Sequence, residues 1–217
     1  MNRFPILFSL FSFLAAFVVS CKSDYRNMYT TSTDIECLAK QLPKRLSTSW
    51  YRTTVDVKGH HITGLLLIKE MPDSSYRVVF TGDAGIRFFD FSFSNSNLFS
   101  VEYAMKQLDK KVVIQALRTD FELLLGIPYR NKNVEALKLK TENYFAFTNK
   151  KETAYIVYDS VECKTLRLES SSRSVKKTTL QTFGSNSGSP DSVVIAHHTF
   201  DMTIRLSKIE KTDAPQE

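Results

Sequence analysis

The sequence lacks the short motifs by which most enzymes are recognised. It contains no Gly-x-Ser-x-Gly nucleophile elbow, no phosphate-binding glycine loop and no His-Glu-x-x-His zinc motif. Histidine occurs four times, as the adjacent pairs His60-His61 and His197-His198. Neighbouring residues of a strand face opposite ways, so each pair offers one ring to a given site. We therefore expect no enzyme activity, no metal site and no cofactor.

Cysteine is also scarce, with three residues in the chain. None lies in a Cys-x-x-Cys pair, which argues against redox or metal chemistry. Cys21 is explained by the N-terminal signal described next, which leaves Cys37 and Cys163. In an oxidising compartment these two could form a disulfide, or they could remain two buried thiols, and the sequence leaves both alternatives open.

The one long apolar run lies at the N-terminus. Arg3 is followed by an almost wholly apolar stretch, 4–19, and then by Ser20-Cys21. This order predicts a signal peptide over 1–20, and the cysteine directly after a small residue predicts the lipoprotein type, with a diacylglyceryl group and commonly palmitate on Cys21. The alternative is a transmembrane anchor, but the run is shorter than the ~20 residues that a span needs. Because Lys22, not Asp, follows the cysteine, we expect a lipid anchor in the outer membrane. We expect the domain to face the periplasm, and the sequence leaves the outward orientation open as an alternative.

Acidic residues are outnumbered, with 23 Asp and Glu against 29 Lys and Arg and a formal net charge of +6. For an exported protein this excess suggests anionic lipid headgroups or envelope glycans as partners, and no nucleic acid. The alternative, which we favour, is that the pairs Lys110-Lys111, Lys150-Lys151 and Lys176-Lys177 belong to solvated turns.

The mature chain shows the pattern of a single β-rich domain. We expect a lipidated tether over 21–33, a short helix over 34–46, a second helix over 109–125 ending at Gly126 and Pro128, and a domain spanning 34–217. Elsewhere the apolar residues alternate with polar ones, which predicts strands. The predicted strands are 50–57, 62–69, 76–81, 89–93, 99–105, 134–140, 144–149, 152–161, 164–169, 193–198 and 200–209, with a flexible loop at 184–192. The expected fold is mainly β with few helices: an antiparallel curled sheet forming an unclosed β-barrel over a helix.

An aromatic stripe marks the inner face of this sheet. Phe89, Phe91 and Phe93 alternate with Asp90 and Ser92. The stripe has two interpretations, core packing or the lining of an acyl-chain pocket, and the spacing favours packing slightly. The candidate lipid-binding residues from the stripe, the next strand and the helix are Phe89, Phe91, Phe93, Val101, Tyr103, Phe121 and Leu124.

Three stretches resemble the outer-membrane lipoprotein receptor family, LolB, and more distantly its periplasmic relative, LolA. They are 64–85, from Gly64 through Tyr76-Arg77 to Gly85, the helix end 123–128, and the last strand 204–209. The resemblance implies an unclosed β-barrel over helices, a hydrophobic cavity for lipoprotein acyl chains, and a periplasmic carrier protein as partner, with no nucleotide or metal. The family displays a bulky apolar residue, usually Leu, on a loop that here reads Gly82-Asp83-Ala84-Gly85. Asp83 and Ala84 are thus candidates for a membrane-facing loop, but the small Ala84 weakens that expectation.

Two hypotheses from different classes follow. The leading one is a LolB-like outer-membrane lipoprotein that binds acyl chains and takes part in lipoprotein or lipid trafficking. The alternative is a non-catalytic structural or ligand-binding subunit of an envelope complex, whose cavity is filled by its own side chains. An envelope enzyme is a third alternative for which the sequence offers no positive sign.

Overall fold

The described part of the chain forms one large antiparallel sheet with two helices. The computed structural model describes residues 23–210 except 97, 131–132, 150–151, 173–174 and 185–187, so the predicted signal peptide and Cys21 lie outside the described residues. The strands are β1 (Tyr29–Thr30), β2 (Ser49–Val57), β3 (His60–Glu70), β4 (Tyr76–Gly82), β5 (Arg87–Phe93), β6 (Phe99–Ala104), β7 (Val134–Leu139), β8 (Glu142–Asn149), β9 (Glu152–Asp159), β10 (Lys164–Ser172), β11 (Val175–Phe183), β12 (Ser192–His197) and β13 (Met202–Lys208).

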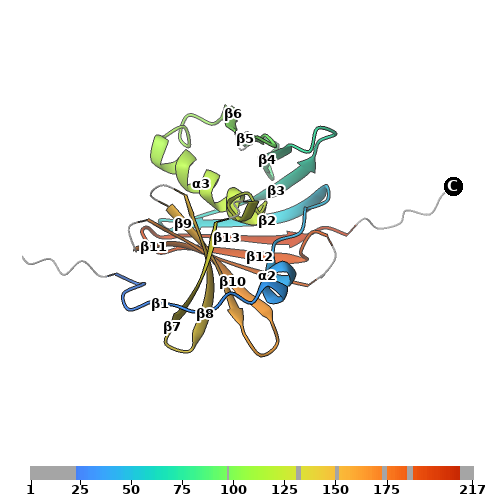
Figure 1. Ribbon diagram of the computed structural model, residues 1–217. Coiled ribbons are helices and arrows are strands. Elements are labelled where there is room, and N and C mark those ends of the chain that lie inside the picture. The colour runs from blue at the N-terminus through green and yellow to red at the C-terminus, as the bar shows by residue number, and fades with distance from the viewer. Residues whose placement is uncertain are drawn as a thin grey trace, which may run out of the picture.

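The strand order brings the last strand of the chain beside the second strand, in the interior of the sheet. The order is β1-β7-β8-β9-β10-β11-β12-β13-β2-β3-β4-β5-β6, so the last strand, β13, pairs with β2, and β1 and β6 are the two edges. Figure 1 shows the sheet curving around helix α3, with β3 to β6 on one side of the helix and β7 to β11 on the other. The predicted fold class, a curled and unclosed antiparallel sheet over a helix, is confirmed.

Helix α3 (Lys111–Leu124) crosses the concave face of the sheet. It connects β6, at one edge, to β7, which lies next to the other edge, and it contacts β10 and β11. Its buried side chains fall at helical spacing, which the sequence predicted, and Gly126 ends it with a φ of 70°. A short 3-10 turn, η1 (Pro128–Arg130), then leads to β7. No helix in the part of the chain that the structure describes has the length and apolar composition to span a membrane.

Helix α2 (Ile35–Gln41) is shorter than predicted. Asp34 caps its N-terminus by accepting a hydrogen bond from the Cys37 amide at 2.9 Å, as the sequence indicated. The helix ends at Gln41, not at Leu46, because Leu42 precedes Pro43 and adopts the extended backbone that proline imposes on its neighbour. Between α2 and β2 the chain runs without helical structure to Ser49.

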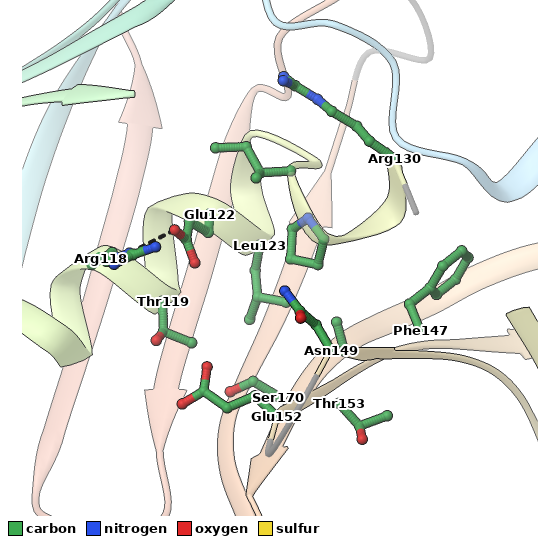
Figure 2. A pocket seen from close by; sticks show the side chains of 13 residues that line it. Arg118, Thr119, Glu122, Leu123, Arg130, Phe147, Asn149, Glu152, Thr153 and Ser170 are labelled. Atoms are coloured by element: carbon green, nitrogen blue, oxygen red, sulfur yellow. Dashed lines mark hydrogen bonds and ion pairs between the residues drawn. The ribbon is translucent and has the colours of Figure 1, made fainter. Parts of the chain in front are cut away.

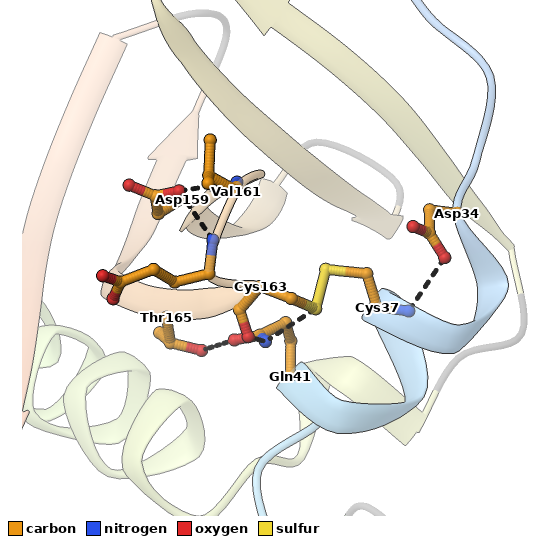
Figure 3. The surroundings of a disulfide bond; sticks show 8 residues. Asp34, Cys37, Gln41, Asp159, Val161, Cys163 and Thr165 are labelled. Carbon is orange, nitrogen blue, oxygen red and sulfur yellow. Dashed lines mark hydrogen bonds between the residues drawn. A yellow bond between two sulfur atoms is a disulfide. The ribbon is translucent and has the colours of Figure 1, made fainter.

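Cys37 and Cys163 form a disulfide, which decides between the two alternatives that the sequence left open. Their Cα atoms lie 5.6 Å apart, and the bond joins α2 to the turn between β9 and β10 (Figure 3). Beside it, Gln41 donates a hydrogen bond to the Cys163 carbonyl and accepts one from Thr165. Helix α2 is therefore fixed to the sheet by one covalent bond and a small polar network.

The structure adds two strands that the sequence pattern did not predict. Strand β11 follows β10 after a short turn, and strand β1 lies within the segment predicted as a tether. Thr30 pairs with Leu137, and Tyr25 is only 7% exposed on the convex face of the sheet. Within the predicted tether over 21–33, the described residues are therefore not free of the sheet, because Tyr25 docks onto it and β1 pairs with β7.

Candidate functional site

The aromatic stripe of β5 is packed core. Phe89, Phe91 and Phe93 are all buried, and the Phe89 and Phe91 rings stack with centroids 4.5 Å apart. From α3, the Phe121 ring lies 5.7 Å from Phe89, and Leu124 is also buried. These side chains fill the space between helix and sheet that an acyl chain would need. Packing, the interpretation that the spacing favoured, therefore describes this stripe.

The two candidates on β6 lie on opposite faces. Tyr103 pairs with Asp90 and Val101 pairs with Phe91, so Glu102 is an extra residue and forms a bulge. The bulge moves Tyr103 to the convex face, where the Arg87 guanidinium lies 6.0 Å from its ring and 43% of the residue is exposed. The prediction that Tyr103 shares a face with Phe89 is wrong for this reason.

The Asp83-Ala84 loop is the exposed turn between β4 and β5. Gly85 has a φ of 76°, which a glycine adopts without strain, and Thr63 donates a hydrogen bond to the Asp83 carboxylate. Two residues beyond Ala84, Ile86 carries a bulky apolar side chain that is 53% exposed. The loop therefore does display an apolar side chain, at a position that the sequence comparison did not select.

A cavity of about 400 Å³ lies between α3 and the strands β8 to β10, and we call it the α3 cavity. It differs from the predicted site because the aromatic stripe does not line it. Its lining mixes apolar side chains with hydroxyl, amide and charged groups (Figure 2). The lining residues are Arg118, Thr119, Glu122 and Leu123 of α3, Ile127, Pro128 and Arg130 near η1, Phe147 and Asn149 of β8, Glu152, Thr153 and Ala154 of β9, and Ser170 of β10.

Charge around the α3 cavity is largely paired. Arg118 donates to the Glu122 carboxylate at 2.7 Å, and Lys177 lies 3.2 Å from the Glu152 carboxylate. Burial raises the pKa of Glu122, and the bond from Arg118 opposes that rise. The cavity thus presents mixed polarity with no strong field of one sign, which suits a neutral amphipathic ligand better than a highly charged one.

Ser170 is the exception to this pairing. The residue is 5% exposed, and its hydroxyl has no hydrogen-bond partner among the described residues. Figure 2 shows its side chain beside those of Glu152 and Thr119 in the cavity. A buried hydroxyl without a partner costs about 1–3 kcal/mol, so Ser170 is a polar group that the fold leaves unsatisfied beside the cavity.

A second, smaller cavity of about 220 Å³ lies beneath α2. Its apolar lining includes Leu46, Leu124 and Leu168, together with Pro43 and Pro190. Leu124 is therefore the one predicted lipid-binding residue that lines either cavity.

A buried polar cluster fastens α3 to the sheet beside the α3 cavity. The His197 ring lies 2.8 Å from the Asp120 carboxylate, and Thr178 donates to the same carboxylate at 3.4 Å. Asp120 is fully buried, and burial raises the pKa of its carboxyl while the bond to His197 opposes that rise. Asp120 is the polar residue among the buried residues of α3, and its partners come from β11 and β12.

The histidine pairs do not meet. β3, which carries His60 and His61, is separated from β12, which carries His197, by two strands of the sheet. His61 lies 2.6 Å from Asp56, and His197 contacts Asp120. Within the described ranges, no group of three or more His, Cys, Asp or Glu side chains is placed to hold a metal ion.

Comparison with known proteins identifies the fold. No protein-family model matches the sequence, and no curated protein matches it. A LolA superfamily protein from Nitrosomonas europaea has a similar structure, with a TM-score of 0.52 at 11% identity over 85% of this chain and 96% of that one. The chain thus has a LolA-like fold.

Two further solved structures are similar at lower scores. A DUF1329 family protein from Desulfovibrio piger has a TM-score of 0.44 at 8% identity, covering 84% of this chain and 92% of that one. A domain from Vibrio parahaemolyticus, provisionally described as an outer membrane lipoprotein-sorting protein domain, has a TM-score of 0.45 at 11% identity with the same two coverages.

Proposed function

We propose that this protein is a lipid-anchored lipoprotein of the outer membrane that binds an acyl chain in the α3 cavity and takes part in lipoprotein or lipid trafficking. The observation that carries the proposal is the α3 cavity itself, which lies under the helix that crosses a LolA-like sheet. The lipoprotein signal ending at Cys21 supports placement at a membrane. The proposed role is binding and transfer, without catalysis.

The lining of the α3 cavity suits an acylated ligand in physical terms. Leu123, Ile127 and Phe147 offer an apolar wall, and burying each methylene of a chain gains about 0.8 kcal/mol. Asn149, whose side chain is exposed to the cavity, offers a hydrogen bond to an ester or amide carbonyl. A periplasmic carrier that delivers such a chain would be the partner, and differential affinity for the chain would drive transfer without a nucleotide.

A fluorescent fatty acid bound to the unlipidated domain tests the proposal. Thr119→Trp places a large ring in the α3 cavity from the surface of the helix, and Gln115→Trp, one turn earlier and exposed, is the matched control. We expect Thr119→Trp to weaken fatty-acid binding at least tenfold and Gln115→Trp to leave it unchanged. Thermal unfolding of both variants checks that the fold is retained.

The alternative, a non-catalytic subunit of an envelope complex, is favoured by the packed aromatic stripe. Phe91 is fully buried against its neighbours, so that part of the concave face has no room for a ligand. If neither fatty acid nor a lipoprotein from a loaded carrier binds, and a stable partner copurifies after crosslinking, this second function replaces the first.

A further inference from the structure

The segment that follows the predicted lipidation site is fixed to the convex face of the sheet. Tyr25 stacks on Tyr155 with ring centroids 4.6 Å apart and meets the edge of Tyr144 at 6.5 Å. Its hydroxyl donates to the Glu169 carboxylate at 2.7 Å. The side chain is therefore held by both an aromatic pocket and a hydrogen bond to a buried charge.

The charge that holds Tyr25 is itself well supported. Glu169 is fully buried, and it accepts hydrogen bonds from Arg167 at 2.6 Å and Lys176 at 2.7 Å. The Lys176 ammonium also lies 5.8 Å from the Tyr25 ring. Because two cations remain on Glu169 when Tyr25 is removed, this network survives the loss of the tyrosine.

Two further contacts fix the chain on either side of Tyr25. Before it, the Asp24 carboxylate accepts a hydrogen bond from the Lys176 amide at 2.8 Å. After it, Tyr29 and Thr30 form β1, the edge strand that pairs with β7. The described N-terminal segment thus runs along the convex face with contacts at three successive points.

Chain length then limits where the lipid can lie. Cys21 precedes Tyr25 by four residues, which span at most about 14 Å when fully extended. Asp24 is bonded to the start of β11, so the lipid must lie near the turn between β10 and β11, whatever path 21–23 takes.

The α3 cavity occupies the same end of the sheet. Val175, the first residue of β11, pairs with Ser172, which pairs with the cavity residue Glu152 on β9. Two strand spacings, about 10 Å, separate Val175 from Glu152. Lys177 also joins β11 to the cavity through its ion pair with Glu152.

We infer that the docked N-terminal segment orients the domain on the bilayer, with the β8–β11 end and its α3 cavity facing the membrane that carries the Cys21 lipid. The inference rests on the proposed lipidation of Cys21 and goes beyond it, because a free tether would leave all orientations open. A lipid from the same bilayer then reaches the cavity over a short path.

The single tryptophan provides the test. Trp50 lies at the start of β2, at the opposite end of the sheet, and is 48% exposed beside Leu67. The lipidated mature protein is reconstituted into phosphatidylcholine vesicles that contain brominated acyl chains, which quench a nearby tryptophan. The wild type reports quenching at position 50, and the double variant Trp50→Phe/Val175→Trp reports quenching at position 175. Val175 is 42% exposed, so this site accepts the ring. We expect quenching at 175 to exceed quenching at 50 severalfold.

Variants of the docked segment separate its role from that of the lipid. Tyr25→Ser frees the segment and should bring quenching at the two positions close together, whereas Tyr29→Ser, at a side chain 55% exposed in the same segment, should not. Cys21→Ser removes the lipid anchor, so any quenching that remains in this variant comes from lipid bound in the cavity. The mass of the N-terminal peptide shows whether Cys21 carries a lipid.

Three results overturn the inference. Stronger quenching of Trp50 would show that the domain lies on the membrane through the exposed side chains of Trp50 and Leu65. Equal quenching in the lipidated protein would show a free tether, with lipidation and fatty-acid binding still standing. An unmodified N-terminal peptide would remove the anchor itself, and the fatty-acid assay would still report separately on the cavity.

Discussion

Removing the disulfide between Cys37 and Cys163 should cost a large share of the stability of this domain. The bond closes a loop with a sequence separation of 126 residues. In the chain-entropy treatment, a crosslink that closes a loop of that length lowers the entropy of the unfolded chain, which stabilises the folded state by about 5 kcal/mol at 25 °C. Removing a native disulfide typically lowers the free energy of unfolding by about 2–5 kcal/mol. The double variant Cys37→Ala/Cys163→Ala should therefore be less stable by about 3–5 kcal/mol.

Urea unfolding followed by far-UV circular dichroism measures this difference. With a urea dependence of about 2 kcal/mol per M, the midpoint should fall by roughly 2 M. The wild-type protein in a strong reductant should move to the midpoint of the double variant, and the variant itself should not respond to the reductant. A urea midpoint that falls by less than about 0.5 M would refute this prediction, because the disulfide would then contribute little to the free energy of unfolding.

Three further predictions concern contacts inside the sheet. His197→Ala leaves the buried Asp120 carboxylate without its main partner and should lower the free energy of unfolding in urea by about 3 kcal/mol. Adding Asp120→Asn to this variant removes the unpaired charge and should restore part of that loss. Gly64→Ala places a Cβ 2.3 Å from a backbone oxygen of the neighbouring strand and should lower stability by about 1–3 kcal/mol; an unchanged melting temperature would contradict that clash. The hydrogen bond from Arg167 lowers the pKa of Glu142 to about 2, so its stabilising contribution is complete above the usual pKa of 4.5 and is lost as the pH falls toward 2. The gap in melting temperature between wild type and Glu142→Gln should therefore close over that pH range, and a constant gap would count against it.

Alternation in the sequence was sufficient to predict most of the sheet. The phenylalanines of β5 and the apolar residues of α3 follow the periods of a strand and a helix, and their burial confirms both. Tyr103 was misplaced because a bulge adds one residue to β6, and a register shift of one moves a side chain to the other face. Spacing along one strand contains no information on such a shift.

Strands β1 and β11 were missed for a different reason. β11 begins with Val175-Lys176-Lys177 followed by two threonines, so few apolar residues mark its inner face. Its two lysines form ion pairs with carboxylates of β10 and β9. β1 and Tyr25 depend on partners more than 100 residues away, such as Glu169 at a separation of 144. Long-range partners of this kind leave no local pattern.

The α3 cavity could not be predicted from the sequence because its lining comes from five separate elements. Strand alternation directed attention to the aromatic stripe, whose side chains are buried and do not line the α3 cavity. Ser170 and Thr119 are unremarkable in the sequence, and only the packing of α3 against β8 to β10 makes them neighbours. Whether a concave face is filled or hollow is decided by volumes, which residue classes alone do not determine.

The most direct test of lipid binding is the mass of the ligand that the protein retains from the cell. The unlipidated domain, exported without Cys21 and purified without detergent, is extracted and its lipids are identified by mass spectrometry, beside Thr119→Trp prepared in the same way. We predict close to one acylated molecule per protein in the wild type and a loss of most of it in the variant. An empty wild-type protein, or equal lipid in both, would contradict the assignment of the α3 cavity as an acyl-chain site.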